Sequence, residues 1–252
     1  MIIDEDYNMI EFQNISRKMI ESLSLSFEPV GVALYGPDDP LPENASFTDK
    51  NFKSYCQALV LAGKGEVFLL RKEQMGCKLG TSVLGFEKDR YAYLDDGVLE
   101  KHGVGLFATE EASAETILKS TFLEKGITQA AFIAPLSSFI KTPQVVVFTA
   151  NSEQVMWLLY AANYDKGGKM NLPQSGGALG GCADITALPI LESVPNITFL
   201  GLGCRIKSAI EPGDLMMGIP GKDLEMLAHN IENMAKPIAM LVNSRETPES
   251  NQ

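Results

Sequence analysis

The sequence predicts an α/β or mixed α+β fold with helices packed on a sheet, and a weak internal repeat suggests two pseudo-repeated halves. Segments typical of strands and of helices alternate through most of the chain. The 252 residues are 45% hydrophobic, which is enough to bury a substantial core. The two regions that contain cysteines also resemble each other. We therefore expect an N-terminal helix (1–27), a compact domain (28–236, with halves at about 28–125 and 126–236) and a polar C-terminal tail (237–252).

Apolar periodicity and the positions of glycine and proline predict the individual elements. The first helix is expected within residues 7–25, where apolar residues recur at helical spacing. Short apolar runs bounded by turn residues predict strands at 29–36, 66–70, 130–136 and 144–150. Further helices are expected at 56–62, from residue 77, and at 113–125, 153–164 and 223–234. The polar end, 243–252, is expected to be frayed.

Charge and composition exclude several classes of partner. The net charge is −11, and no cluster of Lys and Arg is interleaved with aromatic residues, so neither nucleic acid nor an anionic membrane is an expected partner. The amino terminus has helical spacing and an acidic start, which is unlike a signal peptide or a membrane-spanning helix. We expect a cytoplasmic protein, in which four cysteines are free thiols or metal ligands rather than two disulfides.

The cysteines fall into two pairs of similar spacing. Cys56 and Cys77 are 21 positions apart, and Cys182 and Cys204 are 22 positions apart. Each pair is accompanied by glycines and short helical segments. Two related halves packed face to face would bring four thiols toward one crevice. The alternative is a coincidence among a small number of Gly and Cys residues.

Several motifs, taken in their order along the chain, resemble an uncharacterised prokaryotic family, domain of unknown function 169. They are "PVGVALYG", "SYCQALVLAGKGEVFLL", "GCKLGTSVLGF", "QVVVFTANSEQVMWLLYAA", "GGALGGCAD", "FLGLGCR" and "MMGIPGKDLEMLAHNI". The resemblance covers residues 28–236 and implies that Cys56, Cys77, Cys182 and Cys204 belong together. It implies no activity, because none is established for the family.

Four thiolates are the usual ligand set of a 4Fe-4S cluster and of structural zinc. No close CxxC pair is present, so an iron–sulfur cluster held from four separate loops is favoured over zinc, although the usual ferredoxin spacing is also absent. The first three cysteines are expected at helix amino termini, where a thiol pKa is lowered. Backbone N–H groups beside the sulfurs would point at inorganic sulfide, and we assign this role to Gly76, Gly180, Gly181 and Gly203.

The expected function is therefore electron transfer, or a reductive step in a cofactor or sulfur pathway. The partner would be an unidentified redox protein or small-molecule substrate, and the chain could form a homo-oligomer. Whether it is an enzyme stays open, since electron transfer needs no acid, base or nucleophile. Asp184 is expected to cap the helix that begins beside it.

The alternative is a small-molecule or nucleotide/phosphate-binding protein with structural cysteines and no cluster. An anion could bind at the helix after Gly181, near Lys64, Lys166 and Lys169. Neither a complete Rossmann fingerprint nor a complete P-loop motif is present.

Overall fold

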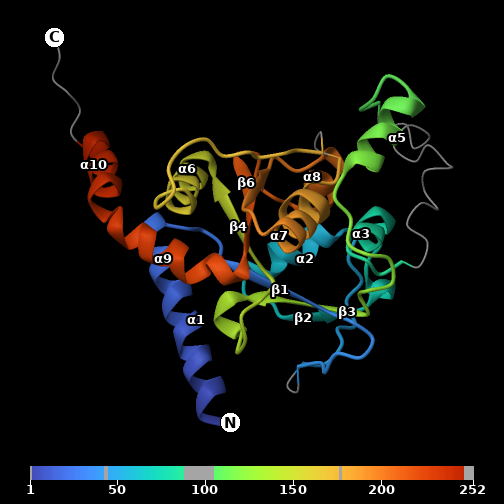
Figure 1. Ribbon diagram of the computed structural model, residues 1–252, viewed down its shortest axis with the longest axis horizontal. Helices are drawn as coiled ribbons and strands as arrows, with labels where there is room; N and C mark the ends of the chain where they lie inside the picture. The colour runs from blue at the N-terminus through green and yellow to red at the C-terminus, as the bar shows by residue number, and fades with distance from the viewer. Residues whose placement is uncertain (1, 43–44, 88–104, 176–177, 247–252) are drawn as a thin grey trace.

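The computed structural model describes residues 2–42, 45–87, 105–175 and 178–246 (Figure 1). The predicted fold class is confirmed: helices pack on an open six-stranded antiparallel sheet. The strand order is β2-β3-β1-β4-β6-β5. The strands are β1 (Val30–Tyr35), β2 (Phe68–Leu70), β3 (Ala130–Pro135), β4 (Val145–Asn151), β5 (Asn196–Thr198) and β6 (Asp214–Pro220).

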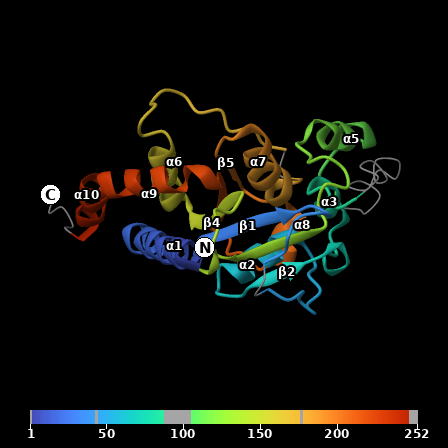
Figure 2. The same cartoon turned by 60° about the horizontal axis from the view of Figure 1, so that its bottom comes forward.

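Two groups of helices cover the two faces of the sheet (Figures 1 and 2). Strand β4 shows the alternation that separates them: Val145 and Val147 face the first group, whereas Val146 and Phe148 face the second. The first group contains α2 (Tyr55–Ala62), α3 (Lys78–Val83), a π-helix (Gly180–Ala187), α7 (Leu188–Glu192) and α8 (Leu202–Ser208). The second contains α1 (Ile2–Leu23), α6 (Ser152–Ala162), α9 (Leu224–Asn233) and α10 (Ala235–Glu246).

Local signals explain where several helices begin. The Ser54 side chain accepts a hydrogen bond from the Gln57 N–H and caps α2. Asn151 caps α6 in the same way. Thr109 caps α5 (Glu110–Lys119), which lies at the periphery beside α3 (Figure 1). Helix α10 continues through Glu246, so the first four residues of the segment expected to be frayed are helical.

The sheet consists of two halves with the same strand pairing. In each half the third strand lies between the first strand and a short second strand, which is β2 or β5. Both third strands end in a proline and continue into a 3-10 turn, Leu136–Ser138 or Gly221–Asp223. The opposing residues also correspond between the halves. Val30 lies opposite Pro135 as Val145 lies opposite Pro220, and Phe68 lies opposite Ile133 as Asn196 lies opposite Gly218.

The central strands pair symmetrically. Val30 lies opposite Val147 and Val32 opposite Val145, while Gly31 faces Val146 at the centre. Exchanging β1 with β4 therefore reproduces the register, which places a pseudo-twofold axis between Gly31 and Val146. On this pairing β3 belongs to the first half, so we place the division between the halves in the segment before β4 rather than at residues 125/126.

Among the described helices, none is both long and apolar enough to cross a membrane.

Candidate thiolate site

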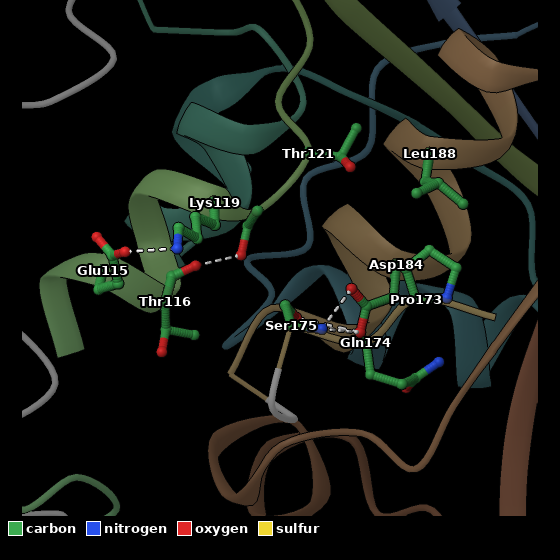
Figure 3. Close-up of a pocket in the computed structure, with 10 residues that line it drawn as sticks. Glu115, Thr116, Lys119, Thr121, Pro173, Gln174, Ser175, Asp184 and Leu188 are labelled. Carbon is green, nitrogen blue, oxygen red and sulfur yellow. Dashed lines mark hydrogen bonds and ion pairs between the residues drawn. The ribbon is translucent and has the colours of Figure 1, made fainter. Parts of the chain in front are cut away.

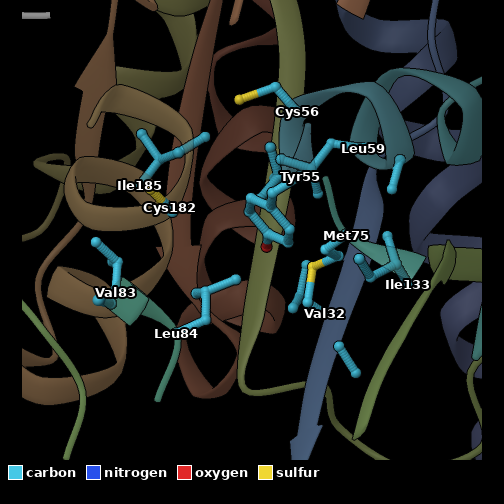
Figure 4. Packing of buried hydrophobic residues seen from close by; sticks show 14 of the residues in the cluster. Val32, Tyr55, Cys56, Leu59, Met75, Val83, Leu84, Ile133, Cys182 and Ile185 are labelled. Carbon is cyan, nitrogen blue, oxygen red and sulfur yellow. The ribbon is translucent and has the colours of Figure 1, made fainter. Parts of the chain in front are cut away.

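Each of the four cysteines lies in the first turn of a helix or next to it. Cys56 is the second residue of α2, Cys77 immediately precedes α3, Cys182 is the third residue of the π-helix and Cys204 is the third residue of α8. All four are free thiols. Cys56 and Cys182 are buried, and the other two are half-buried. Cys56 and Cys182 project between helices of the first group in Figure 4.

The packing of these helices brings the two halves together at the thiols. Helix α2 of the first half packs on α8 of the second, and α3 of the first half packs on the π-helix of the second. The Cys56 thiol donates a hydrogen bond to the Cys204 sulfur. A charge on Cys77 raises the pKa of Cys182, and both interact electrostatically with Cys204. The four side chains thus form one group, here called the thiol group.

The thiol pKa is raised in three of the cysteines and lowered in the fourth. The hydrogen bond to Cys204, together with burial, raises the pKa of Cys56, and burial raises the pKa of Cys77 and Cys182. The pKa of Cys204 is lowered, first by the Cys56 hydrogen bond, then by the N–H groups of Gly181 and Gly201 and by the Lys207 charge. The prediction that helix amino termini lower the thiol pKa was therefore wrong for the first three cysteines, because burial raises the pKa of Cys77 and Cys182, and the hydrogen bond to Cys204 together with burial raises that of Cys56.

Close packing explains two of the glycines assigned to cofactor binding. A Cβ atom on Gly181 would lie 2.3 Å from the Cys56 sulfur, and one on Gly180 would lie 2.2 Å from the Thr198 hydroxyl oxygen. Both glycines therefore allow the π-helix to approach its neighbours, α2 and β5. The Gly181 N–H also donates to the Cys204 sulfur. Gly176 and Gly177 of the same "GGALGGCADI" stretch lie outside the described residues.

The other two assigned glycines have different surroundings. The Gly76 N–H donates to the Phe52 carbonyl at 2.7 Å, so this amide is already used. A Cβ atom on Gly203 would meet no atom within 4 Å, because the residue is exposed on α8. The N–H groups that do point at sulfurs belong to Leu79 and Gly80 at Cys77, Ala183 at Cys182, and Gly181 and Gly201 at Cys204.

Polar contacts fix the π-helix beside the thiol group. The buried Tyr55 hydroxyl lies 3.1 Å from the Thr186 hydroxyl, which donates to the Gly181 carbonyl at 2.8 Å. The Asn196 side chain donates to the Asp184 carbonyl at 3.0 Å. A π-helix is rare and frequently occurs at functional sites, but nothing in the residue pattern distinguished this one from an ordinary helix.

Asp184 does not cap the helix, contrary to expectation. Its carboxylate accepts hydrogen bonds from the backbone N–H and the hydroxyl of Ser175 (Figure 3). Burial raises the pKa of this carboxyl to about 6. Its charge in turn raises the pKa of Cys182.

The thiol group has the donor chemistry of a soft-metal site but not the arrangement of a closed single-ion site. Within the described ranges, no three Cys, His, Asp or Glu side chains are placed to hold a metal ion. One buried polar atom near the group lacks a hydrogen bond: the hydroxyl of Ser208, one helical turn after Cys204. The lysines of the alternative hypothesis are dispersed. Lys64 stacks on Phe27, while Lys166 and Lys169 are exposed on the segment after α6.

Comparisons with known proteins agree with the resemblance seen in the motifs. The profile of domain of unknown function 169, described as "Uncharacterised ArCR", matches residues 18–230. The uncharacterized protein MJ0308 of Methanocaldococcus jannaschii is 26% identical over 224 residues, which cover 88% of this chain and 94% of that protein. No solved structure matches.

Proposed function

Because the chain belongs to domain of unknown function 169, whose description names no activity, we propose its function from the thiol group: it binds an iron–sulfur cluster and serves electron transfer or a reductive step. The observation that carries this proposal is that packed helices from two equivalent halves bring the four cysteines close enough to influence one another's pKa values. Two cysteines come from each half, in the pairing that the spacing suggested.

The chemistry of the group supports iron and sulfide as ligands. Four cysteines are the usual ligand set of a 4Fe-4S cluster. Backbone N–H groups already point at the sulfurs of Cys77, Cys182 and Cys204, and hydrogen bonds of this kind stabilise thiolates and adjust the reduction potential of a bound cluster. Lys207 adds a positive charge that lowers the pKa of both Cys77 and Cys204.

Metal binding would require changes in protonation and in side-chain position. The raised pKa values keep Cys56, Cys77 and Cys182 protonated at neutral pH when no metal is bound. Loading would therefore release protons and become tighter as the pH rises. The Cys56 sulfur would also have to give up its hydrogen bond to Cys204. Cys204, whose pKa is lowered, is the thiolate that is available first.

The bound cluster would supply one-electron chemistry, and the protein would hold and partly shield it. Cys56 and Cys182 are buried, whereas Cys77 and Cys204 are half-buried. An unidentified redox protein or small molecule would exchange electrons from the more accessible side, that of Cys77 and Cys204.

The test is anaerobic purification and reconstitution, with iron and sulfide analysis and an absorption spectrum. Cys77→Ala and Cys182→Ala are each expected to remove most of the bound iron while the chain stays folded. Gly203→Ala is the matched control: it lies next to Cys204 in α8 and its Cβ atom would meet no atom within 4 Å, so its iron content should equal that of the wild type.

Two results would contradict the proposal. Full iron retention in either cysteine variant would exclude a shared site. A wild-type protein that takes up no iron and sulfide under anaerobic conditions would leave the cysteines as structural residues and favour the small-molecule or phosphate-binding alternative.

A further inference from the structure

A cavity of about 280 Å³ lies beside the π-helix, at Asp184 (Figure 3). It is bounded by α5, by the segment that precedes the π-helix and by the π-helix itself. Its size is just below the roughly 300–1,000 Å³ typical of small-molecule sites. Its lining includes Glu115, Lys119, Thr121, Gln174, Asp184 and Leu188.

Asp184 connects the cavity with the π-helix. In a helix with i→i+5 hydrogen bonds, residues that are two positions apart point in directions that differ by nearly half a turn. Asp184 and Cys182 therefore lie on roughly opposite faces of the π-helix. The Asp184 side chain lines the cavity, although the residue is only 5% exposed. Among the described residues, its carboxylate accepts hydrogen bonds from Ser175 alone, at 3.1–3.3 Å. An ionised carboxylate has about four acceptor positions, so capacity remains on the side that faces the cavity.

The charges around the cavity do not balance. Glu115 and Lys119 form an ion pair of 2.6 Å along α5, which neutralises both. Within the part of the chain that the structure describes, no Lys or Arg forms an ion pair with Asp184. A buried carboxylate without a cation is energetically unfavourable. A positively charged ligand in the cavity would provide the missing partner.

We propose that this cavity binds a small organic cation whose ammonium or amidinium group pairs with the Asp184 carboxylate. Two further oxygens on the wall suit such a donor-rich ligand. Neither the Thr121 hydroxyl nor the Gln174 side-chain oxygen has a hydrogen-bond partner among the described residues, whereas the Gln174 amide nitrogen is used by the Ile197 carbonyl. Leu188 and Pro173 provide apolar contacts for a short carbon chain.

This inference does not rest on the iron–sulfur proposal, so its test uses iron-free protein. Butylammonium, butyrate and butanol are titrated at an ionic strength of about 0.15 M, which screens the general attraction of cations to an acidic surface. Amide NMR shifts are followed. Butylammonium is expected to give saturable shifts at Ser175, Asp184 and Leu188, with a dissociation constant of about 1 mM or tighter. Butyrate and butanol should give none.

Two variants and a control separate recognition from folding. Asp184→Asn should weaken butylammonium binding at least tenfold, by loss of about 1.4 kcal/mol or more of charge pairing. Leu188→Phe keeps the carboxylate but fills the cavity, and should also abolish binding even if Asp184→Asn fails to fold. Glu115→Gln is the control, since its carboxylate is already paired with Lys119, and it should bind like the wild type.

The proposal is overturned if butylammonium produces no saturable shift in the wild type, if butyrate or butanol binds equally well, or if either Leu188→Phe or a folded Asp184→Asn protein retains wild-type affinity.

Discussion

A single methyl group added at Gly181 should disturb both stability and the thiol group. In Gly181→Ala the new Cβ atom would lie 2.3 Å from the Cys56 sulfur, whereas a favourable contact needs roughly 3.5–4.0 Å. The sulfur must therefore move by more than about 1 Å. Cys56 is only 2% exposed and is held in α2 among buried side chains, so it has little room to do so. The movement would also break its hydrogen bond to Cys204.

The expected magnitude follows from two opposing effects. Overpacking of this kind costs about 1–3 kcal/mol. Replacing a helical glycine by alanine returns about 0.5–1 kcal/mol. The difference spans about 0–2.5 kcal/mol, and because the obstructing sulfur is buried we expect a net loss of about 1–2 kcal/mol. Since 1 kcal/mol corresponds to roughly 2–4 °C in a chain of this size, the melting temperature should decrease clearly. Gly203→Ala is the matched control: its Cβ atom meets nothing within 4 Å, and it should be neutral or stabilised by up to about 1 kcal/mol.

Denaturant unfolding of iron-free protein and iron content after reconstitution are the two measurements. Gly181→Ala should lose stability and iron, whereas Gly203→Ala should lose neither. In a Cys56→Ala background the stability cost of Gly181→Ala should disappear, because the obstructing sulfur is gone. The reasoning would be refuted if Gly181→Ala were as stable as the wild type, or if its cost were the same with and without the Cys56 sulfur.

Three further predictions concern the surroundings of the site. Arg205 donates to the carbonyls of Phe199, Glu211, Pro212 and Asp214, so Arg205→Lys, which keeps the charge but not the planar fork, should cost about 1–3 kcal/mol in denaturant unfolding; an unchanged midpoint would contradict this role. The pKa of Asp184 is about 6 in the folded protein, above the ordinary 3.8, so folding favours the protonated carboxyl. The contribution of Asp184 to the free energy of unfolding is therefore fully present below pH 3.8 and is lost as the pH rises through 6. Iron-free Asp184→Asn should therefore gain up to about 3 kcal/mol relative to the wild type between pH 4 and pH 7, and parallel pH profiles would disprove this. Tyr55→Phe should cost about 1 kcal/mol through loss of the contact with Thr186, and a thermal midpoint equal to that of the wild type would show that this contact contributes nothing.

The sequence predicted the parts of the fold that depend on local patterns. The strands expected at 29–36, 66–70, 130–136 and 144–150 coincide with β1 to β4, because runs of buried apolar residues bounded by turns are strong local signals. The antiparallel strand order depends on which strands meet after folding. Spacing along the chain does not contain that information.

For the site, the sequence predicted which residues gather but not their electrostatics. The spacing of the cysteines indicated one pair in each half, but comparison of the motifs "GC" at 76–77 and "GGC" at 180–182 equated Cys77 with Cys182. The order of the elements instead makes Cys56 equivalent to Cys182 and Cys77 equivalent to Cys204. A lowered pKa was predicted for Cys56, Cys77 and Cys182, but it occurs at Cys204. The burial of the first three thiols and the hydrogen bond between Cys56 and Cys204 both depend on tertiary packing, which the sequence does not show. The cavity beside Asp184 was also not predictable, since α5 and the π-helix are about 70 residues apart in the chain.

The symmetric register of β1 and β4 has an evolutionary consequence. Because Gly31 and Val146 face each other at the axis, a half-length chain that associated with a second copy of itself would form the same six-stranded sheet. The helix pairs α2 with α8 and α3 with the π-helix would then both be contacts between subunits. The present chain thus has the architecture of a fused homodimer. In such an ancestor neither subunit alone would have contained all four thiols.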